Sequence, residues 1–455
     1  MSNNHADSYT EKVVSGPIAR TILSLALPVV AGMGMEILLS VIDFYWVGKL
    51  GASAQDAVTS SMVIIWTMFS AVSLISIGIT ALVSRHVGAN NTERAVHYIR
   101  QALSLAVIVA VVVSLGGYLL TPGFMDFMKV GPASQMHAVL YLRIFFASCL
   151  MLFLNETAYA VFRASGDTRT PTKVGIIVVL LNLVLDPLLI FGYGPIPAMG
   201  VPGASIATAI SISVGTILIF RSMLRGRLGY RIDKLLQWKP DYPSMLHIAR
   251  IGLPIASQQL AFVVVYWFLI GFVHEFGEIA GAAMGIGNRM ESFSYLTCYG
   301  FSLAASTMVG QNLGAGKPDR AARCAWGATG LGVALTLVFG FLFVAFPTAI
   351  ASVFTEDQAV LEIAVGYLII LGLSQFAMAV EIILEGAFSG AGDTIPPMVV
   401  MIPGSIARIP LAWYLAFELD WGIEGIWWTL TITTAFKALV LAYWFRMNRW
   451  KTKKV

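Results

Sequence analysis

Stretches of twenty or more mostly apolar residues recur along the whole chain, and this recurrence limits what the chain can fold into. A helix of about 20 apolar residues spans the ~30 Å hydrocarbon core of a bilayer. Only 12% of the 455 residues are charged, and the mean hydropathy is +0.78. A soluble protein carries about 25% charged residues. No alternating ten-residue pattern of a β-barrel is present, so we expect an all-α integral membrane protein.

Glycine, proline and charged residues divide the apolar stretches into twelve predicted transmembrane helices. Their approximate limits are 21–48, 58–84, 98–120, 136–162, 172–192, 203–222, 248–273, 280–308, 324–347, 359–389, 397–417 and 424–446. The N-terminal residues 1–16 are polar and lack the basic and then apolar pattern of a cleaved signal peptide. We therefore expect the first span to remain in the mature protein.

The basic residues are distributed unevenly between the two sets of loops. Of the 29 lysines and arginines, 23 lie in the termini and loops assigned to one face, whereas the other face holds only Lys49 and Lys129. Cytoplasmic loops of membrane proteins are enriched in such residues. The sequence thus predicts a multi-pass protein of the cell inner membrane with both termini in the cytoplasm.

A shift of 226 residues aligns the first half of the chain with the second. The aligned positions are Leu27-Pro28 with Leu253-Pro254, Gly88 with Gly314, Arg94 with Arg320, Tyr141 with Tyr367, and the tripeptide GDT at 166–168 with that at 392–394. Each half holds six spans, an even number, so both halves begin on the same face and the repeats are parallel. We expect two pseudo-symmetric six-helix lobes that face each other across a central cleft.

These features give a predicted domain plan. An N-lobe at 21–222 and a C-lobe at 248–446 are joined by a basic cytoplasmic linker at 223–247. A cytoplasmic segment at 1–20 precedes the lobes, and a basic cytoplasmic tail at 447–455 follows them.

Four polar side chains of the first half lie at nearly the same predicted depth. Asp43, Asp186 and Thr208 lie roughly 8 Å below the outer ends of their helices, and Asn182 lies one turn deeper than Asp186. Ionisable residues within spans are costly and usually functional. Two neighbouring carboxyl groups in a low dielectric do not both stay ionised, so one can hold a proton near neutral pH. The four residues form a candidate site for a cation or proton, provided that their helices touch.

The repeat indicates that this acid pair is not a scaffold feature. Under the 226-residue shift, Asp43 maps to Leu269, Asn182 to Arg408 and Asp186 to Ala412. The alternative is that Asp43 and Asp186 face water at a wide outer opening and have no specific role.

Other polar side chains within spans are candidates for substrate binding or for a second coupling site. Glu381, for example, maps onto Asn155, so both halves are polar there. The alternative is a structural role, in which Arg143, Arg289 or Arg408 holds the carboxylates. The full set of candidates is Glu36, Asn155, Gln258, Gln259, Glu291, Glu381 and Glu385.

Several other functions are disfavoured. The segment GAGKP at Gly314–Pro318 is not a P-loop, because Gln311 occupies the first glycine position and Pro318 the final Ser/Thr position. The cysteines and histidines lack metal-ligand spacing, and no catalytic constellation of an enzyme such as a membrane transferase is evident. We expect no catalytic residues, no metal and no cofactor. The charge of +4 is explained by topology, so no nucleic-acid partner is expected.

Taken together, several motifs resemble the multidrug and toxic compound extrusion (MATE) family over essentially the whole chain. They are LALPVV in the first span, VIDFYWVGKLG at the outer end of that span, LNLVLDPLLIFG in the fifth, GIGNRMESFSYLTCYGFSLAASTMVGQNLGAGKPDRA in and after the eighth, the two GDT turns, and RIPLAWYL in the eleventh. The resemblance implies a V-shaped pair of six-helix lobes that opens alternately to the two sides. It also implies export of cationic amphipathic compounds in exchange for H⁺ or Na⁺.

The family's first-lobe coupling residues correspond to Asp43, Asn182, Asp186 and Thr208. Family members coupled through the second lobe commonly carry an acid in the seventh span, where this chain has Gln258 and Gln259. The resemblance therefore favours first-lobe coupling. The predicted partners are small organic cations or drugs, H⁺ or Na⁺, and membrane lipids, with the protein acting as a monomer. The alternative function is a flippase for a lipid-linked or amphipathic metabolite, although that function predicts a more basic cleft.

Overall fold

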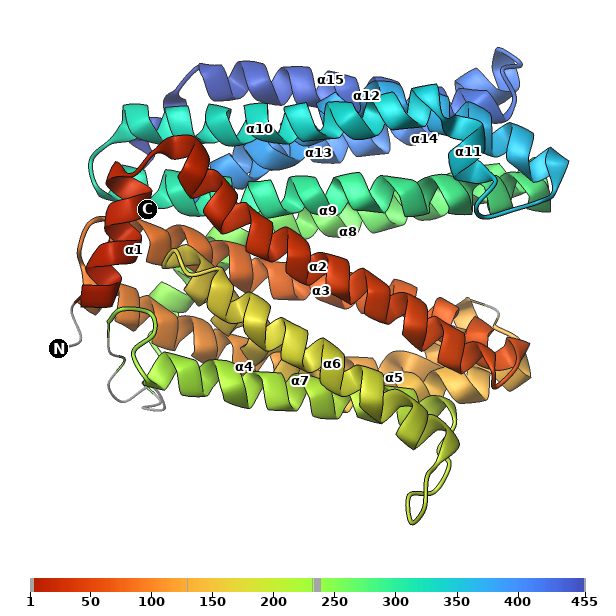
Figure 1. Ribbon diagram of the computed structural model, residues 1–455, viewed down its shortest axis with the longest axis horizontal. Helices are drawn as coiled ribbons and strands as arrows, with labels where there is room; N and C mark the ends of the chain where they lie inside the picture. Colours follow the sequence, from red (N-terminus) through yellow and green to blue (C-terminus); the bar gives the residue numbers. More distant parts are fainter. Residues whose placement is uncertain (1–3, 129, 231, 233–238, 454–455) are drawn as a thin grey trace. The chain divides into compact units, whose positions relative to one another are not determined.

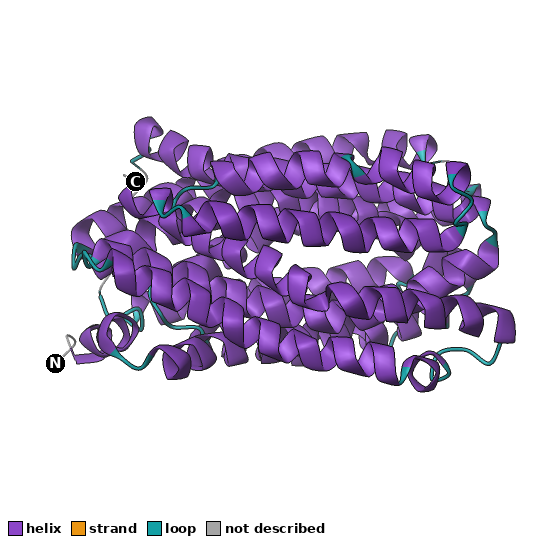
Figure 2. Cartoon of the chain, turned by 90° about the horizontal axis from the view of Figure 1, so that it is seen from above, coloured by secondary structure: helices purple, strands orange, loops and turns teal. Residues whose placement is uncertain are grey.

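The computed structural model describes residues 4–128, 130–230, 232 and 239–453, and these residues form helices joined by short loops (Figures 1 and 2). Within the described residues, the one β-type pairing is an isolated bridge between Tyr193 and Ile196. The prediction of an all-α membrane protein is confirmed. Lys129 and parts of the predicted N-terminal segment, linker and tail fall outside the described residues.

Each of the twelve predicted spans corresponds to a helix or, in one case, to consecutive helices. In the first half these are α2 (Ile18–Gly48), α3 (Ala52–Gly88), α4 (Thr92–Phe127), α5 (Pro132–Ala164), α6 (Arg169–Phe191) and α7 (Val201–Leu224). In the second half they are α8 (Tyr242–Glu275), α9 (Glu278–Gly314), α10 (Pro318–Ala345), α12 (Gln358–Ala391), the run α13 (Ile395–Ile406), α14 (Arg408–Trp413) and η1 (Tyr414–Glu418), and α15 (Ile423–Arg446). The shorter elements are α1 (Asn4–Ser15), α11 (Pro347–Ala351) and η2 (Arg449–Thr452).

Among the described residues, eleven helical segments are long and apolar enough to cross a membrane. The exception is α9, which has 37 residues but carries polar side chains such as Asn288, Arg289 and Glu291. This helix packs against α10 and α12. Protein contacts in place of lipid contacts explain how a long helix tolerates these polar residues.

The predicted eleventh span is broken because proline interrupts it. Pro410 has no amide hydrogen to donate to the carbonyl of Ile406, and α13 ends at Ile406 before α14 begins at Arg408. A π-helical turn, η1, follows at Tyr414–Glu418. The break places Arg408 at a helix start inside the protein, where its side chain is 6% exposed.

The two GDT tripeptides form helix-ending turns. Asp167 Oδ1 accepts hydrogen bonds of 3.0 Å from the amides of Arg169 and Thr170 at the start of α6. Gly392 ends α12 in the left-handed region at φ 74°, which glycine adopts without a steric cost. These turns set where α6 and α13 begin.

The chain forms two compact units. The first comprises Met1–Lys12 and Ala31–Gly252, and the second comprises Val13–Val30 and Leu253–Val455. The first half of α2 therefore packs within the second unit, and the start of α8 packs within the first. The predicted lobe boundaries at 21 and 248 assign each helix to a single lobe. In the structure, α2 and α8 each contribute to both units.

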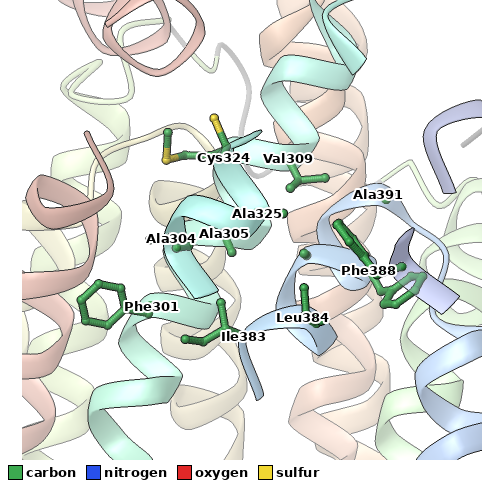
Figure 3. Close-up of a cluster of buried hydrophobic side chains, with 14 of the residues drawn as sticks. Phe301, Ala304, Ala305, Val309, Cys324, Ala325, Ile383, Leu384, Phe388 and Ala391 are labelled. Atoms are coloured by element: carbon green, nitrogen blue, oxygen red, sulfur yellow. The ribbon is translucent and has the colours of Figure 1, made fainter. Parts of the chain in front are cut away.

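The core of the second unit includes many small side chains on α9, α10 and α12, packed with larger ones such as Phe301 and Ile383 (Figure 3). Ala304 and Ala305 of α9 are fully buried beside Ala325 of α10 and Phe388 of α12. A Cβ atom at Gly390 would lie 2.1 Å from the carbonyl oxygen of Ser306. Small residues let helix backbones approach closely, which is how helices associate in a bilayer.

Candidate functional site

Asp43 of α2 and Asp186 of α6 form a pair of carboxyl groups within the first unit. The two side chains lie within hydrogen-bonding range of each other. Asp186 is 1% exposed, and Asp43 is half-buried. The helices that carry these acids therefore meet, as the depth argument required.

Asn182 is the third member of this site. It lies one helical turn before Asp186, and its Nδ2 donates a hydrogen bond of 2.9 Å to Asp186 Oδ1. Residues four apart share a helix face, so α6 alone determines this contact. Asn182 is 2% exposed, and its amide fixes the orientation of the Asp186 carboxyl group.

An aromatic contact joins the C-terminal ends of α2 and α6. The rings of Trp46 and Phe191 meet edge to face with their centroids 5.9 Å apart. Trp46 lies one turn after Asp43, and Phe191 follows Asp186 by five residues. This contact, close to both acids, keeps the two carboxyl groups near each other.

The hydrogen bonds of the acid pair are incomplete while both groups are ionised. Asp43 Oδ1 and Asp186 Oδ2 are buried, and no donor from the described residues reaches either atom. A buried acceptor without a donor costs about 1–3 kcal/mol. One proton held between the two carboxyl groups would turn a repulsive contact into a hydrogen bond.

The charge of the pair is not balanced by a neighbouring base. Among the described residues, the groups that interact with Asp43 and Asp186 are each other, Asn182 and Tyr141, with no lysine or arginine among them. None of the ion pairs among the described residues includes either acid. A proton or a cation bound at the pair would neutralise this charge.

Tyr141 of α5 is a neighbour of the pair that sequence analysis did not identify as a site residue. It is 7% exposed and interacts electrostatically with both Asp43 and Asp186. Its backbone carbonyl accepts a 2.9 Å hydrogen bond from Ser205 of α7. Its polar hydroxyl group within an apolar span could have indicated a site residue. In the sequence analysis, Tyr141 was used only to align the two halves of the chain.

The position of Thr208 of α7 relative to the acid pair is inferred from the internal repeat. Its hydroxyl donates a 3.1 Å hydrogen bond to the carbonyl of Ala204 in its own helix. In the second unit, the equivalent Thr434 accepts a 3.0 Å hydrogen bond from Arg408, the equivalent of Asn182. This repeat relation is the geometric argument for placing Thr208 near Asn182.

The second unit fills the positions of the acid pair with apolar side chains. Leu269 and Ala412 are both fully buried, and they belong to one hydrophobic cluster with Tyr367 and Trp427. The Tyr367 ring stacks on Trp427 with a centroid distance of 4.1 Å. The same location in the repeat is thus packed core in one unit and a buried acid pair in the other.

Two buried bases, Lys437 and Arg408, lie among the three predicted acids of the second unit. Lys437 Nζ lies 2.7 Å from Glu381 Oε1, and Lys437 is only 2% exposed. Glu291 and Glu381 interact electrostatically with the buried Arg408, whose Nε donates a 2.9 Å hydrogen bond to Thr433. Sequence analysis missed Lys437, although a lysine within an apolar span was the signal for it.

Gln258 is one of the two glutamines of α8 that were predicted as candidates for substrate binding or a second coupling site. Its Nε2 donates a 2.8 Å hydrogen bond to Glu385 Oε2, which links α8 to α12 within the second unit. Gln259 is half-buried on the same helix. Of the bases suggested to hold the acids, Arg143 instead lies over the Tyr118 ring at 5.0 Å.

Glu36 belongs to a second acidic group in the first unit. It interacts electrostatically with Glu156 of α5, a residue that sequence analysis did not identify, and with Arg163. Glu156 Oε2 lies 3.9 Å from Arg163 Nη2. The neighbouring Asn155 donates a 3.4 Å hydrogen bond to Thr216 of α7. Two carboxylates beside one guanidinium leave a net negative charge at the exposed Glu36.

Comparison with known proteins gives the family. A family model described as MatE matches residues 28–188 and again residues 254–414. The chain belongs to the MATE family. The two matches begin 226 residues apart and end 226 residues apart, as the internal repeat predicts. This MATE protein is therefore a transporter of a multidrug efflux family and not an enzyme.

Named relatives and solved structures extend over nearly the whole MATE chain. A probable multidrug resistance protein, NorM, of Thermotoga maritima is 27% identical and covers 98% of this chain and 96% of its own length. A FAD transporter of Shewanella oneidensis is also 27% identical and covers 95% of each chain. A MOP superfamily transporter from Pyrococcus furiosus shares the fold with a TM-score of 0.90 at 21% identity, covering 97% of this chain and 98% of its own.

Proposed function

We propose that this MATE transporter exports cationic amphipathic compounds in exchange for H⁺, or alternatively Na⁺, by alternating access. The coupling site in this proposal is Asp43 and Asp186, with Asn182 and Thr208 beside them. It would act as a monomer in the cell inner membrane with both termini in the cytoplasm and without a cofactor. The observation that carries the proposal is a buried carboxyl pair with no neighbouring base.

A proton suits this pair better than a sodium ion does. One proton shared by Asp43 Oδ1 and Asp186 Oδ2 would supply the donor that both buried oxygens lack. Sodium requires several oxygen ligands, and Asn182 already directs its NH₂ group, rather than its carbonyl oxygen, at Asp186. We therefore place H⁺ first as the coupling ion.

The proposed cycle couples protonation to a change in packing between α2 and α6. In the ionised form, Asp43 and Asp186 repel each other and attract a cation. A proton entering from outside would join the two carboxyl groups and close the contact between the helices. Pro28 in α2 and Pro187 in α6 interrupt the hydrogen-bond ladders of these helices, which allows them to bend. The drug leaves as its electrostatic attraction to the site is lost.

Within this proposal, the acids outside the pair have other tasks. Glu381 and its partner Lys437 have a structural role in the second unit. Because the charge of Glu381 is paired with that of Lys437, this carboxylate does not exchange a proton or cation. Glu36, together with Glu156, is the better candidate for attracting a substrate cation, because Arg163 balances only one of the two carboxylates.

The test is efflux of a fluorescent organic cation from proteoliposomes under an imposed pH gradient and, separately, under a Na⁺ gradient. We expect wild-type efflux to follow the pH gradient, and Asp43→Asn and Asp186→Asn to reduce it to the level of protein-free liposomes. The matched control is Asp56→Asn, since Asp56 is an exposed acid on α3. Full activity of either pair variant would eliminate the proposed coupling site.

A second candidate function is flipping or export of an anionic amphipathic metabolite. The relative from Shewanella oneidensis that is named a FAD transporter gives this candidate its support. The unbalanced acids Asp43, Asp186 and Glu36 oppose it, because they repel phosphate groups. Efflux of the dye under neither gradient, together with movement of an anionic substrate, would favour this second function.

A further inference from the structure

A basic cavity lies between α6 and α7 of the first unit, away from the acid pair. Its volume is about 300 Å³. Four of its lining residues are basic: Lys173 on α6, Arg221 and Arg225 at the end of α7, and Arg227 just beyond it. All four side chains are exposed. None of them forms an ion pair with an acidic residue that the structure describes.

Among the residues that the structure describes, the charges around this cavity are not balanced. Four positive side chains around one cavity repel one another, and the nearby acid on the described part of the chain does not neutralise them. That acid is Asp167, which is 3% exposed and binds the amides of Arg169 and Thr170. An anionic ligand would supply the missing charge, and arginine and lysine are the side chains that commonly bind phosphate.

The rest of the lining is mainly apolar. Val174 and Ile177 of α6 and Leu218 of α7 contribute the apolar part, and Thr170 and Ser222 add two hydroxyl groups. Ile177 is 45% exposed, and the apolar surface continues along α6 through Leu180 and Val184, which are 49% and 56% exposed. These residues lie three and seven positions after Ile177, so they share one helix face. A free phosphate would leave this surface uncovered, whereas the acyl chain of a lipid would cover it.

The cavity also lies at the membrane face where such a lipid is abundant. It is formed by the first turns of α6 and the last turn of α7, at the end assigned to the cytoplasm by the bias of basic residues. The cytoplasmic leaflet carries anionic lipids, and basic pockets between transmembrane helices on that side bind their head groups.

We propose that the cavity lined by Lys173, Arg221, Arg225 and Arg227 binds the phosphate head group of an anionic membrane lipid, with the acyl chain along Ile177 and Leu180. This site is separate from the proposed exchange at Asp43 and Asp186. It would anchor the cytoplasmic ends of α6 and α7 in the leaflet.

The experiment is native mass spectrometry of the full-length protein with added phosphatidylglycerol, phosphatidylcholine or inorganic phosphate. We expect the wild type to retain phosphatidylglycerol in preference to the other two. The variant Arg221→Gln/Arg225→Gln should lose affinity by on the order of fivefold for each charge removed. The matched control is Arg446→Gln/Arg449→Gln, which removes two exposed arginines at the end of the chain and should bind as the wild type does.

Three results would overturn the proposal. If phosphatidylglycerol and phosphatidylcholine bind equally well, the cavity does not select a negatively charged head group. If inorganic phosphate binds as well as phosphatidylglycerol, the acyl chain does not contribute and the ligand need not be a lipid. If both double variants lose the same affinity for phosphatidylglycerol, the lipid is attracted by the general positive charge of the protein and not by this cavity. If the glutamine variant does not fold, Arg221→Lys/Arg225→Lys takes its place. That variant keeps the charge and should keep the preference for phosphatidylglycerol, and loss of that preference in the folded lysine variant would also contradict the proposal.

Discussion

At the scale of single residues, the two units differ in whether a basic side chain lies beside a buried acid. Asp186 has an amide and a second carboxyl group as neighbours, whereas Glu381 has the ammonium group of Lys437 at 2.7 Å. We propose that the paired Glu381 has a structural role and that the unpaired Asp186 exchanges a proton or cation.

Removing one member of the buried ion pair should destabilise the protein. Lys437→Met removes the ammonium group that lies 2.7 Å from Glu381 and leaves Arg408 as its remaining basic neighbour. Breaking a buried ion pair costs about 3–5 kcal/mol. We expect a lower Tm for the purified protein in detergent. The double variant Glu381→Gln/Lys437→Met removes both charges and should recover most of the lost stability. A Tm unchanged by Lys437→Met would show that the pair is not structural.

At the scale of helices, close backbone contact joins α8 to α3 within the first unit. A Cβ atom at Gly252 would lie 1.7 Å from the carbonyl oxygen of Leu74, and one at Gly78 would lie 2.2 Å from that of Ile248. Polar contacts support the crossing nearby, since the backbone amide of Asp241 donates a 2.8 Å hydrogen bond to Gln101 of α4. The start of α8 is therefore fixed in the first unit.

The close contact between α3 and α8 predicts that a single methyl group added at Gly252 lowers the stability of the protein. Gly252→Ala forces α3 and α8 apart, and overpacking of this kind costs about 1–3 kcal/mol. We expect less folded protein by size-exclusion chromatography and a lower Tm. Gly271→Ala is the control on the same helix, because nothing lies within 4 Å of a Cβ atom there. Equal behaviour of the two variants would contradict the tight crossing.

At the scale of the whole molecule, the bias of basic residues fixes the expected sidedness. The three native cysteines are free and buried, so they should react little with an added thiol reagent. Exposed positions on the two predicted faces are therefore suitable for single introduced cysteines. Tyr193 is 75% exposed in a predicted outer loop, and Met447 is 45% exposed in the predicted cytoplasmic tail.

The topology can be checked by labelling intact cells with a membrane-impermeant maleimide. We expect Tyr193→Cys to react from outside and Met447→Cys to react only after the membrane is opened. The parent protein, which has only buried cysteines, is the control for background labelling. The reverse pattern would place the termini outside and would also move the basic cavity to the opposite leaflet.

The sequence by itself determined the all-helical fold, the twelve apolar segments and the duplication, whereas the division of the eleventh segment into α13, α14 and η1 came from the structure. Apolar length predicts a helix wherever backbone groups must be satisfied inside a bilayer, and the 226-residue repeat needs no coordinates. It also determined the contact between Asn182 and Asp186, because residues four apart on a helix always share a face.

Only the tertiary structure decided which side chains meet across helices. Asp43 and Asp186 are 143 positions apart, and their contact depends on how α2 and α6 pack and rotate. The same is true of Lys437 with Glu381 and of Gln258 with Glu385. Depth along a helix can be read from a sequence, but rotation about its axis is set by packing against distant segments. For this reason the acids were identified from the sequence, while their partners Tyr141, Glu156 and Lys437 were not.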